Sequence, residues 1–220
     1  MCIRDSVKVA RHWWRDFGGL RAARGSQCLG DMTSHALRLG LASLTLLTAF
    51  TFAPDASAED VVRPSTRPAW AAFGLGPSIA TLACGGGGCA SGSFTQFKLT
   101  QEIGYHVNGS GDGFAIGAAV SEAFGNGLFR FQPGLRMWGD IPVSDDLGLY
   151  ITPFGHVGYT LLTGGGATAH AFNPAVGVAA RLVLADRAII SFSPVTFDFL
   201  VDDDGMIMSY ELAFAGGVTF

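Results

Sequence analysis

The last twelve residues of this 220-residue chain, "SYELAFAGGVTF" (Ser209–Phe220), alternate between two kinds of side chain. One set is apolar or aromatic apart from a single glycine: Tyr210, Leu212, Phe214, Gly216, Val218 and Phe220. The other set is small or polar: Ser209, Glu211, Ala213, Ala215, Gly217 and Thr219. Because successive side chains of a β-strand point to opposite faces, this period of two predicts a strand with one apolar and one small, polar face.

The same alternation recurs earlier in the chain, in "QFKLTQEIGYHV" (96–107), "LFRFQPGLRMW" (128–138) and "AVGVAARLVL" (175–184). In "AIISFSPVTFDFL" (188–200) the apolar parity switches after Phe192 and resumes at Val195. An extra residue in one strand of a pair produces such a switch, so we expect a β-bulge at Pro194.

Eight segments of this kind are separated by clusters of Gly, Asp, Asn and Ser. The expected strands are 70–82, 94–107, 114–124, 128–141, 147–162, 172–184, 188–200 and 207–220. An even number of strands joined by tight turns predicts an all-β, eight-stranded antiparallel up-and-down barrel. Their length also suits a membrane, which a tilted strand crosses in about 9–11 residues.

Charged residues are few after residue 58, and this indicates which face of the barrel points inward. After residue 58 the chain carries only seven Lys and Arg against fourteen Asp and Glu. We therefore expect the large apolar face to meet lipid and the small, charged face to line the lumen. The predicted lumen charges are Lys98, Glu102, Arg130, Arg136, Arg181, Asp198 and Glu211. They nearly balance and are expected to pair, since an unpaired buried charge is costly. The acidic excess argues against a nucleic-acid partner.

The chain before the barrel divides into three parts. Residues 1–31 have no apolar periodicity and begin with "MCIRDS", which is typical of translated adapter sequence, so they are expected to be an artefact. Residues 32–58 predict a signal peptide cleaved between Ala58 and Glu59, after the small residues "ASA". An uncleaved membrane anchor is the alternative. Residues 59–69 are expected to be a polar periplasmic entry tail, and residues 70–220 the barrel.

Two cysteines, Cys84 and Cys89, bracket four glycines in "LACGGGGCASGS" (82–93). In an exported protein such a pair predicts a disulfide. A metal site would need about four ligands, and a redox dithiol would need a C-x-x-C spacing before a helix. The segment is therefore expected to be a clipped outer loop between the first two strands, with no metal and no cofactor.

The histidines are candidate catalytic residues, because some eight-stranded barrels modify lipids. His106 is expected inside the barrel, the face of His156 is undecided, and His170 is expected in an outer loop. None has the H-x-S spacing that a lipid deacylase would need on one strand face. The protein is therefore predicted not to be an enzyme, and the acidic run Asp202–Asp204 is expected to be a solvated loop.

Aromatic residues fall near strand ends, which predicts two belts at the membrane interfaces. The expected periplasmic belt contains Trp70, Tyr105, Phe114, Trp138, Tyr159 and Phe220. The expected outer belt contains Phe94, Phe124, Phe129, Phe172, Phe199 and Tyr210.

The segment Tyr210–Phe220 resembles the carboxy-terminal assembly signal of bacterial outer-membrane β-barrels, carried by Tyr210, Leu212, Phe214, Val218 and Phe220. The region from Trp70 to Phe220 is similar in architecture to the eight-stranded OmpA/OmpX type of barrel. The resemblance implies an outer-membrane location, insertion by the barrel-assembly machinery, and contact with outer-membrane lipid and lipopolysaccharide. It also implies a monomer, here without the peptidoglycan-binding domain of many OmpA-type proteins.

The expected function follows from this resemblance and from the lumen. Eight strands leave an interior that side chains can fill, which favours a structural or surface-interaction role in the envelope, with a surface ligand held by the outer loops. The first alternative is a narrow OmpW-like transport barrel for small or hydrophobic solutes. A lipid-modifying enzyme and a soluble periplasmic lipocalin-like barrel are further alternatives.

Overall fold

The computed structural model describes residues 66–85, 88–144, 147–164, 166–203 and 205–220. The predicted signal peptide, its cleavage site at Ala58 and Glu59, and the segment before it lie outside the described residues. None of the described residues forms a helix long and apolar enough to cross a membrane.

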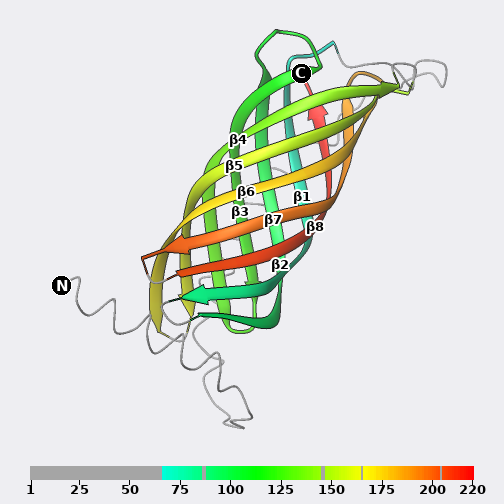
Figure 1. Ribbon diagram of the computed structural model, residues 1–220. Helices are drawn as coiled ribbons and strands as arrows, with labels where there is room; N and C mark the ends of the chain where they lie inside the picture. The colour runs from blue at the N-terminus through cyan, green and yellow to red at the C-terminus, as the bar shows by residue number, and fades with distance from the viewer. Residues whose placement is uncertain (1–65, 86–87, 145–146, 165, 204) are drawn as a thin grey trace. The chain divides into compact units, whose positions relative to one another are not determined.

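Eight strands form one closed sheet. They are β1 (Ala69–Gly85), β2 (Gly88–His106), β3 (Gly113–Gly125), β4 (Leu128–Ser144), β5 (Leu149–Gly164), β6 (Ala167–Leu184), β7 (Ala188–Asp202) and β8 (Gly205–Thr219). Each strand pairs antiparallel with the next, and β1 pairs with β8 to close the barrel (Figure 1). The predicted fold, an eight-stranded antiparallel up-and-down barrel, is confirmed.

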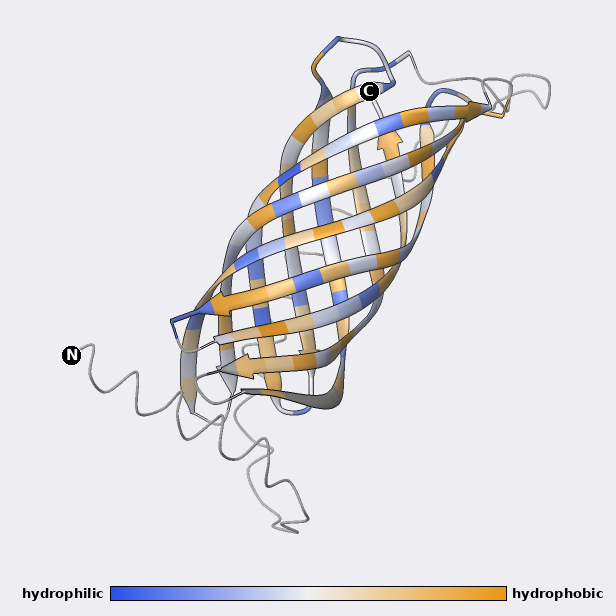
Figure 2. Ribbon diagram, viewed as in Figure 1, coloured by the Kyte–Doolittle hydropathy of each residue, from blue (hydrophilic) through white to orange (hydrophobic). Residues whose placement is uncertain are grey.

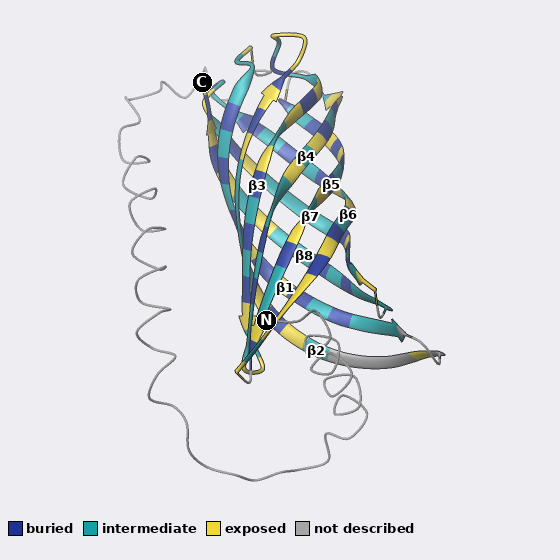
Figure 3. Ribbon diagram, turned by 90° about the vertical axis from the view of Figure 1, so that its left-hand side faces the viewer, coloured by how far each residue is buried: buried dark blue, intermediate teal, exposed yellow. Residues whose placement is uncertain are grey.

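The two sets of residues that alternate in the sequence lie on the inner and the outer side of the barrel wall. Along β4, Arg130 and Gln132 are buried in the lumen, whereas Leu135 and Met137 are exposed on the outside. Figure 2 shows hydrophilic and hydrophobic residues alternating along the strands, and Figure 3 shows the matching alternation of buried and exposed residues. A period of two therefore sets which side chains line the lumen.

The barrel has two ends, called the terminal end and the disulfide end. The terminal end holds Ala69, Phe220 and the β6–β7 turn at Asp186, and the disulfide end holds Cys84 and Cys89. At the terminal end the Phe220 N–H donates to the Ala69 oxygen at 2.8 Å, and the Ala69 N–H donates back at 3.2 Å. The Thr66 N–H donates to Asp186 Oδ1 at 2.7 Å, so the chain just before β1 is fastened to this end as well.

Several strands are longer than predicted at the disulfide end. The segment 84–93 was expected to be a connection, but β1 continues to Gly85 and β2 begins at Gly88. The same holds for 163–171, which mostly belongs to β5 and β6. The predicted boundaries were wrong because ladder hydrogen bonds are made by the backbone, which continues through glycine and serine. The turn between β3 and β4 is a two-residue one, with φ of 55° at Asn126 and 74° at Gly127, as expected for an Asn-Gly hairpin.

The bulge expected at Pro194 is confirmed. The register between β7 and β8 shifts between Ser193 and Thr196. In a regular strand two residues five positions apart point to opposite faces. The register shift lets Phe192 and Phe197 both face outward. The inner face of β7 therefore passes from Ser193 to Thr196 and Asp198.

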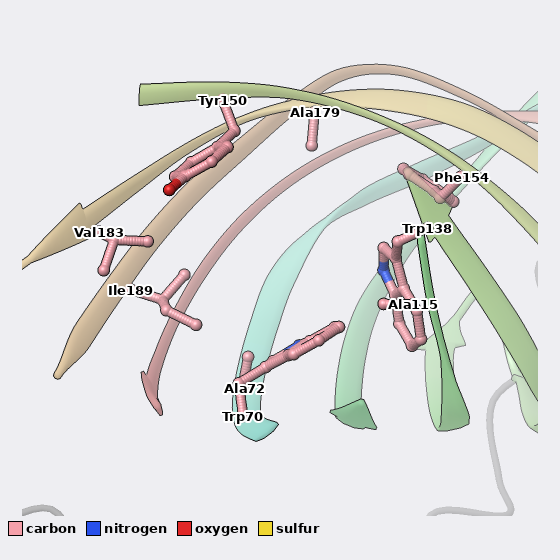
Figure 4. Close-up of a cluster of buried hydrophobic side chains, with 9 residues drawn as sticks. All are labelled: Trp70, Ala72, Ala115, Trp138, Tyr150, Phe154, Ala179, Val183 and Ile189. Carbon is pink, nitrogen blue, oxygen red and sulfur yellow. The ribbon is translucent and has the colours of Figure 1, made fainter. Parts of the chain in front are cut away.

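An aromatic cluster fills the lumen near the terminal end, and it corrects the predicted belts. Trp70 and Trp138 point inward, with 1 % and 4 % exposure and ring centroids 5.1 Å apart (Figure 4). They share this space with Ala72, Ala115, Tyr150, Phe154, Ala179, Val183 and Ile189. Gly104 makes room for the ring of Trp70, since a Cβ there would lie 2.2 Å from Trp70 Cζ2. The two tryptophans were predicted to lie in the periplasmic belt only because they are near strand ends. Their positions in the alternation of β1 and β4 are those of residues that face the lumen.

Tyr159 was also placed at the wrong end. It pairs with Phe172, which belongs to the half of β6 nearer the disulfide end. Because β5 runs from the terminal end towards the disulfide end, residues late in β5 lie with the outer aromatic residues. Tyr159 therefore belongs with Phe172 rather than with Tyr105.

Candidate functional site

Four charged side chains meet across the middle of the lumen and are called here the central network: Lys98 on β2, Arg130 on β4, Asp198 on β7 and Glu211 on β8. Lys98 Nζ lies 2.8 Å from Glu211 Oε1 and 3.5 Å from Asp198 Oδ2. Arg130 contacts the same two carboxylates, at 3.4 Å for Asp198 Oδ2 and 3.3 Å for Glu211 Oε1. Two cations thus neutralise two anions contributed by four different strands.

Uncharged polar side chains add hydrogen bonds to the central network. Arg130 Nη2 donates to Ser78 Oγ at 2.8 Å, and Ser78 Oγ donates to Glu211 Oε1 at 3.0 Å. On the other side Asn173 Nδ2 donates to Asp198 Oδ1, and Gln132 Nε2 donates to Asp198 Oδ2 at 3.2 Å. These hydrogen bonds offset part of the cost of burying the four charges.

A second group, the terminal cluster, lies beside the tryptophans and consists of His106, Asp140, Thr152 and Arg181. Arg181 Nη1 lies 2.5 Å from Asp140 Oδ2, and His106 Nε2 lies 2.8 Å from the same oxygen. Thr152 Oγ1 donates to Asp140 Oδ1 at 2.5 Å. The Arg181 guanidinium also stacks over the ring of Trp70, 4.3 Å from its centroid.

A third ion pair lies between these groups. Arg136 Nη1 contacts Glu102 Oε2 at 2.7 Å, and its guanidinium stacks over Phe154 at 4.8 Å. Next to it the lumen holds a cavity of about 70 Å³, which Arg136, Arg181 and Glu211 line together with small residues of β7 and β8. Side chains of the described residues fill much of the lumen around this cavity.

The seven lumen charges predicted from the sequence all lie inside the barrel, in these three groups. The prediction missed Asp140, the partner of Arg181, which is 3 % exposed. Its parity on β4 is that of Arg130 and Arg136, so the alternation itself would have found it. With Asp140 the lumen cations and carboxylates of these groups balance one for one.

The three histidines of the described residues occupy different surroundings. His106 is buried in the terminal cluster, and its Nδ1 lies 3.3 Å from the Pro68 oxygen. His156, whose face was undecided, points into the lumen at 6 % exposure. The expectation that His170 lies in a loop was wrong: it is an exposed residue of β6, and its Nδ1 is hydrogen-bonded to Tyr159 Oη.

Cys84 and Cys89 form a disulfide, with their Cα atoms 4.1 Å apart. The two residues are direct partners in the β1–β2 register, so the bond joins two strands rather than the ends of a loop. Among the described residues, no His, Cys, Asp and Glu side chains are grouped as a metal ion would require.

The outside of the barrel has the polarity opposite to that of the lumen. Leu135 is 65 % exposed and Ile103 is 53 % exposed, whereas Arg130 is 1 % exposed. Other large apolar residues on the exterior include Leu75, Phe97, Val107, Phe114, Ile116, Ile141, Val157, Phe172, Val176, Ile190 and Phe214. In water so many exposed large apolar side chains would drive aggregation, whereas in a bilayer lipid solvates them.

The chain is a transmembrane β-barrel. Its even number of antiparallel strands, apolar exterior and polar interior are those of single-chain barrels in bacterial outer membranes. The described residues leave no open sheet edge between β1 and β8, because the two strands pair along the seam.

No protein-family model and no curated protein matches the sequence. Among solved structures, the barrel is similar to Neisserial surface protein A, with a TM-score of 0.49 and 12% identity over 68% of this chain and 97% of that one. It is also similar to the N-terminal β-barrel domain of Pseudomonas aeruginosa OprF, with a TM-score of 0.48 and 10% identity over 71% of this chain and 100% of that one. For the outer membrane protein OprG of the same species the TM-score is 0.45, with 11% identity over 72% and 99% of the two chains.

At such low identity a resemblance extends at most to the fold. The apolar exterior and the polar lumen are what place this barrel in a membrane.

Proposed function

We propose that this barrel resides in a bacterial outer membrane, with its termini in the periplasm, and acts there as a structural or surface-contact protein rather than as an open pore. The observation that carries the proposal is the central network. Arg130 and Asp198, each 1 % exposed, block the middle of the lumen together with Lys98 and Glu211. Opening a path would separate desolvated charges, which is costly.

The disulfide end supports a role at the cell surface. Pairing of β2 with β3 begins at Phe97 and Phe124, and Asn126 in the β3–β4 turn donates to the Thr95 oxygen, so Gly88–Phe94 extend past the end of β3 beside β1. The Cys84–Cys89 disulfide joins the two strands near the tip of this hairpin. A hairpin held in one conformation loses little entropy on binding, which favours contact with a ligand or another surface.

Assembly and lipid contact belong to the same proposal. The alternating residues Tyr210, Leu212, Phe214, Val218 and Phe220 serve as the signal read by the barrel-assembly machinery. The exposed apolar side chains contact outer-membrane lipid and lipopolysaccharide. The protein acts as a monomer and without a cofactor.

A narrow transport barrel is the second candidate, and the cavity of about 70 Å³ favours it. Transport would require the central network to rearrange, because its side chains occupy the middle of the lumen. A lipid-modifying enzyme is a weaker alternative. Of the histidines in the described residues, His106 is already bound to Asp140, His156 is buried in the lumen and His170 lies on the outside of β6.

Three measurements test the proposal and its alternatives. The first is fractionation of cells that produce the protein, with gel migration before and after boiling. We expect the protein in the outer membrane with heat-modifiable migration, and recovery in the soluble periplasm would contradict the proposal. The second is recording from planar bilayers. Steady single-channel conductance would overturn the closed lumen in favour of transport. The third is mass spectrometry of lipid A, in which a change in mass on expression of the protein would favour the enzyme.

A further inference from the structure

A carboxylate in the turn between β6 and β7 holds the segment that precedes β1. Asp186 Oδ1 accepts a hydrogen bond from the Thr66 N–H at 2.7 Å. Asp186 Oδ2 accepts from Thr66 Oγ1 at 3.0 Å and from Arg67 Nε at 3.4 Å. These contacts, called here the clasp, join residues that are 120 positions apart in the chain.

Both sides of the clasp are fixed to the sheet. On one side Thr219 of β8 donates through its N–H to the Arg187 oxygen and through Oγ1 to the Asp186 oxygen, each at 2.7 Å. On the other side the His106 N–H, at the end of β2, donates to the Pro68 oxygen at 2.7 Å. The clasp therefore joins the β1–β2 hairpin to the end of β8.

The turn that carries Asp186 is not made of the residues that its backbone favours. Its central residues, Ala185 and Asp186, have φ of 52° and 53°. Turns with two positive φ values favour Asn or Asp followed by Gly, as at Asn126 and Gly127 between β3 and β4. What position 186 gains over a glycine is the carboxylate of the clasp.

The seam between β1 and β8 is where the sequence constrains strand register least. In every other neighbouring pair the two strands follow each other in the chain, and the turn between them fixes the register. Glycine-rich strands specify register weakly, and the ladder of this seam is interrupted between Leu75 and Ser78 by Pro77, which has no N–H. The lumen side of the seam carries small residues: Ala72, Gly74 and Gly76 on β1, and Ala213, Ala215 and Gly217 on β8.

A slip of two residues along this seam would leave the same side chains facing the lumen, because the side-chain period is also two. The slip would move Thr66 about 6–7 Å away from Asp186 and break the clasp. The residues two positions before and after Thr66 are Pro64 and Pro68, and neither has an N–H to take its place. The clasp is therefore specific to one register, whereas backbone groups of the ladder find new partners in another.

We propose that Asp186 is a register key for closure of the barrel, a positioning residue whose carboxylate captures Thr66 and Arg67 when β1 meets β8 in the native register. Hydrogen bonds to a charged group are stronger than those between neutral groups. The two that Thr66 makes to this carboxylate should favour the native seam over a slipped one by about tenfold or more.

Cross-linking of introduced cysteines measures the register directly. Leu75 and Phe214 are direct partners across the seam, so Leu75→Cys with Phe214→Cys forms a disulfide in the native register. Leu75→Cys with Leu212→Cys, or with Gly216→Cys, does so after a slip of two residues in one direction or the other. The full chain is refolded from urea into detergent micelles and then oxidised, with its native cysteines first replaced by serine: Cys2, Cys28, Cys84 and Cys89.

Two glycine substitutions in the same turn separate the carboxylate from the backbone. Asp186→Gly removes the carboxylate and suits the positive φ, so the turn itself is not impaired. Ala185→Gly, the matched control, suits the neighbouring positive φ and keeps the carboxylate. We expect slipped cross-links to rise about tenfold in Asp186→Gly and to stay at the level of the unmodified turn in Ala185→Gly.

The same cross-links in both glycine variants would overturn the proposal. A lower stability of Asp186→Gly in urea with the seam still in the native register would also do so, because it would make Asp186 an ordinary stabilising contact. Should Asp186→Gly fail to fold, Thr66→Ala and Arg67→Gln test the clasp from its other side. Slipped cross-links in either variant support the register key, and the native register in both refutes it.

Discussion

Arg130 Nη1 lies 3.4 Å from Asp198 Oδ2, and each of the two side chains is only 1 % exposed. The two residues belong to β4 and β7, which are not neighbours in the sheet, so their contact crosses the lumen. Lys98 and Glu211 join the same contact from β2 and β8. The interior of the barrel is thus held together by charges from four strands, in addition to the backbone ladder of the wall.

Substituting Arg130 with methionine should destabilise the barrel strongly. Arg130→Met removes the contacts to Asp198, Glu211 and Ser78 and leaves two buried carboxylates with Lys98 as the remaining cation. Breaking a buried ion pair from one side costs about 3 kcal/mol or more. Urea unfolding in detergent micelles measures the change, with Arg187→Met at an exposed turn as the control. A loss below about 1 kcal/mol would show that the network contributes little to stability.

Substituting Gly104 with alanine should displace Trp70. The added Cβ would lie 2.2 Å from Trp70 Cζ2, so the ring or the backbone must move. We expect a loss of about 1–3 kcal/mol in the free energy of unfolding, together with a change in tryptophan fluorescence. Gly155→Ala is the matched control, because a Cβ at that position meets nothing within 4 Å. Equal stability of the two variants would contradict the inward packing of Trp70.

Reducing the Cys84–Cys89 disulfide should loosen the β1–β2 hairpin without unfolding the barrel. Closing so short a loop contributes about 2 kcal/mol, which corresponds to roughly a 30-fold change in the open population. We expect faster protease cleavage within the hairpin after reduction, measured on the inserted protein. In the double variant Cys84→Ser, Cys89→Ser, cleavage should be fast with or without reductant. Two titratable thiols before reduction would refute the bond.

Deleting Phe220 should impair assembly. The deletion removes the two hydrogen bonds between Phe220 and Ala69 at the β1–β8 seam, as well as the last residue of the proposed assembly signal. We expect the heat-modifiable fraction in outer-membrane preparations to fall several-fold. Phe172→Ala, which removes an equally exposed aromatic ring from β6, should assemble normally. Normal insertion of the chain without Phe220 would contradict the role given to it.

The period of two in the sequence was enough to predict the eight strands and the face of each lumen charge. Lys98 and Arg136 could be placed inside because parity is a local property: neighbouring residues of a strand point to opposite sides whatever the strand pairs with. The same rule, applied to Trp70 and Trp138, would have placed them inside too. Strand ends were less predictable, because backbone pairing continues through glycine residues, which add nothing to the apolar pattern.

Partners across the lumen could not be read from the sequence. Parity puts Arg181 and Asp140 on inner faces, but they contact each other only because of the tilt and stagger of β4 and β6 in the closed barrel. The same closure brings Arg136 and Arg181 to one cavity and leaves their Nε–H groups unpaired. Which side chains face inward follows from the order of the residues, because it depends on alternation along one strand. Which of them meet follows from the closed barrel, because it depends on the register of all eight strands together.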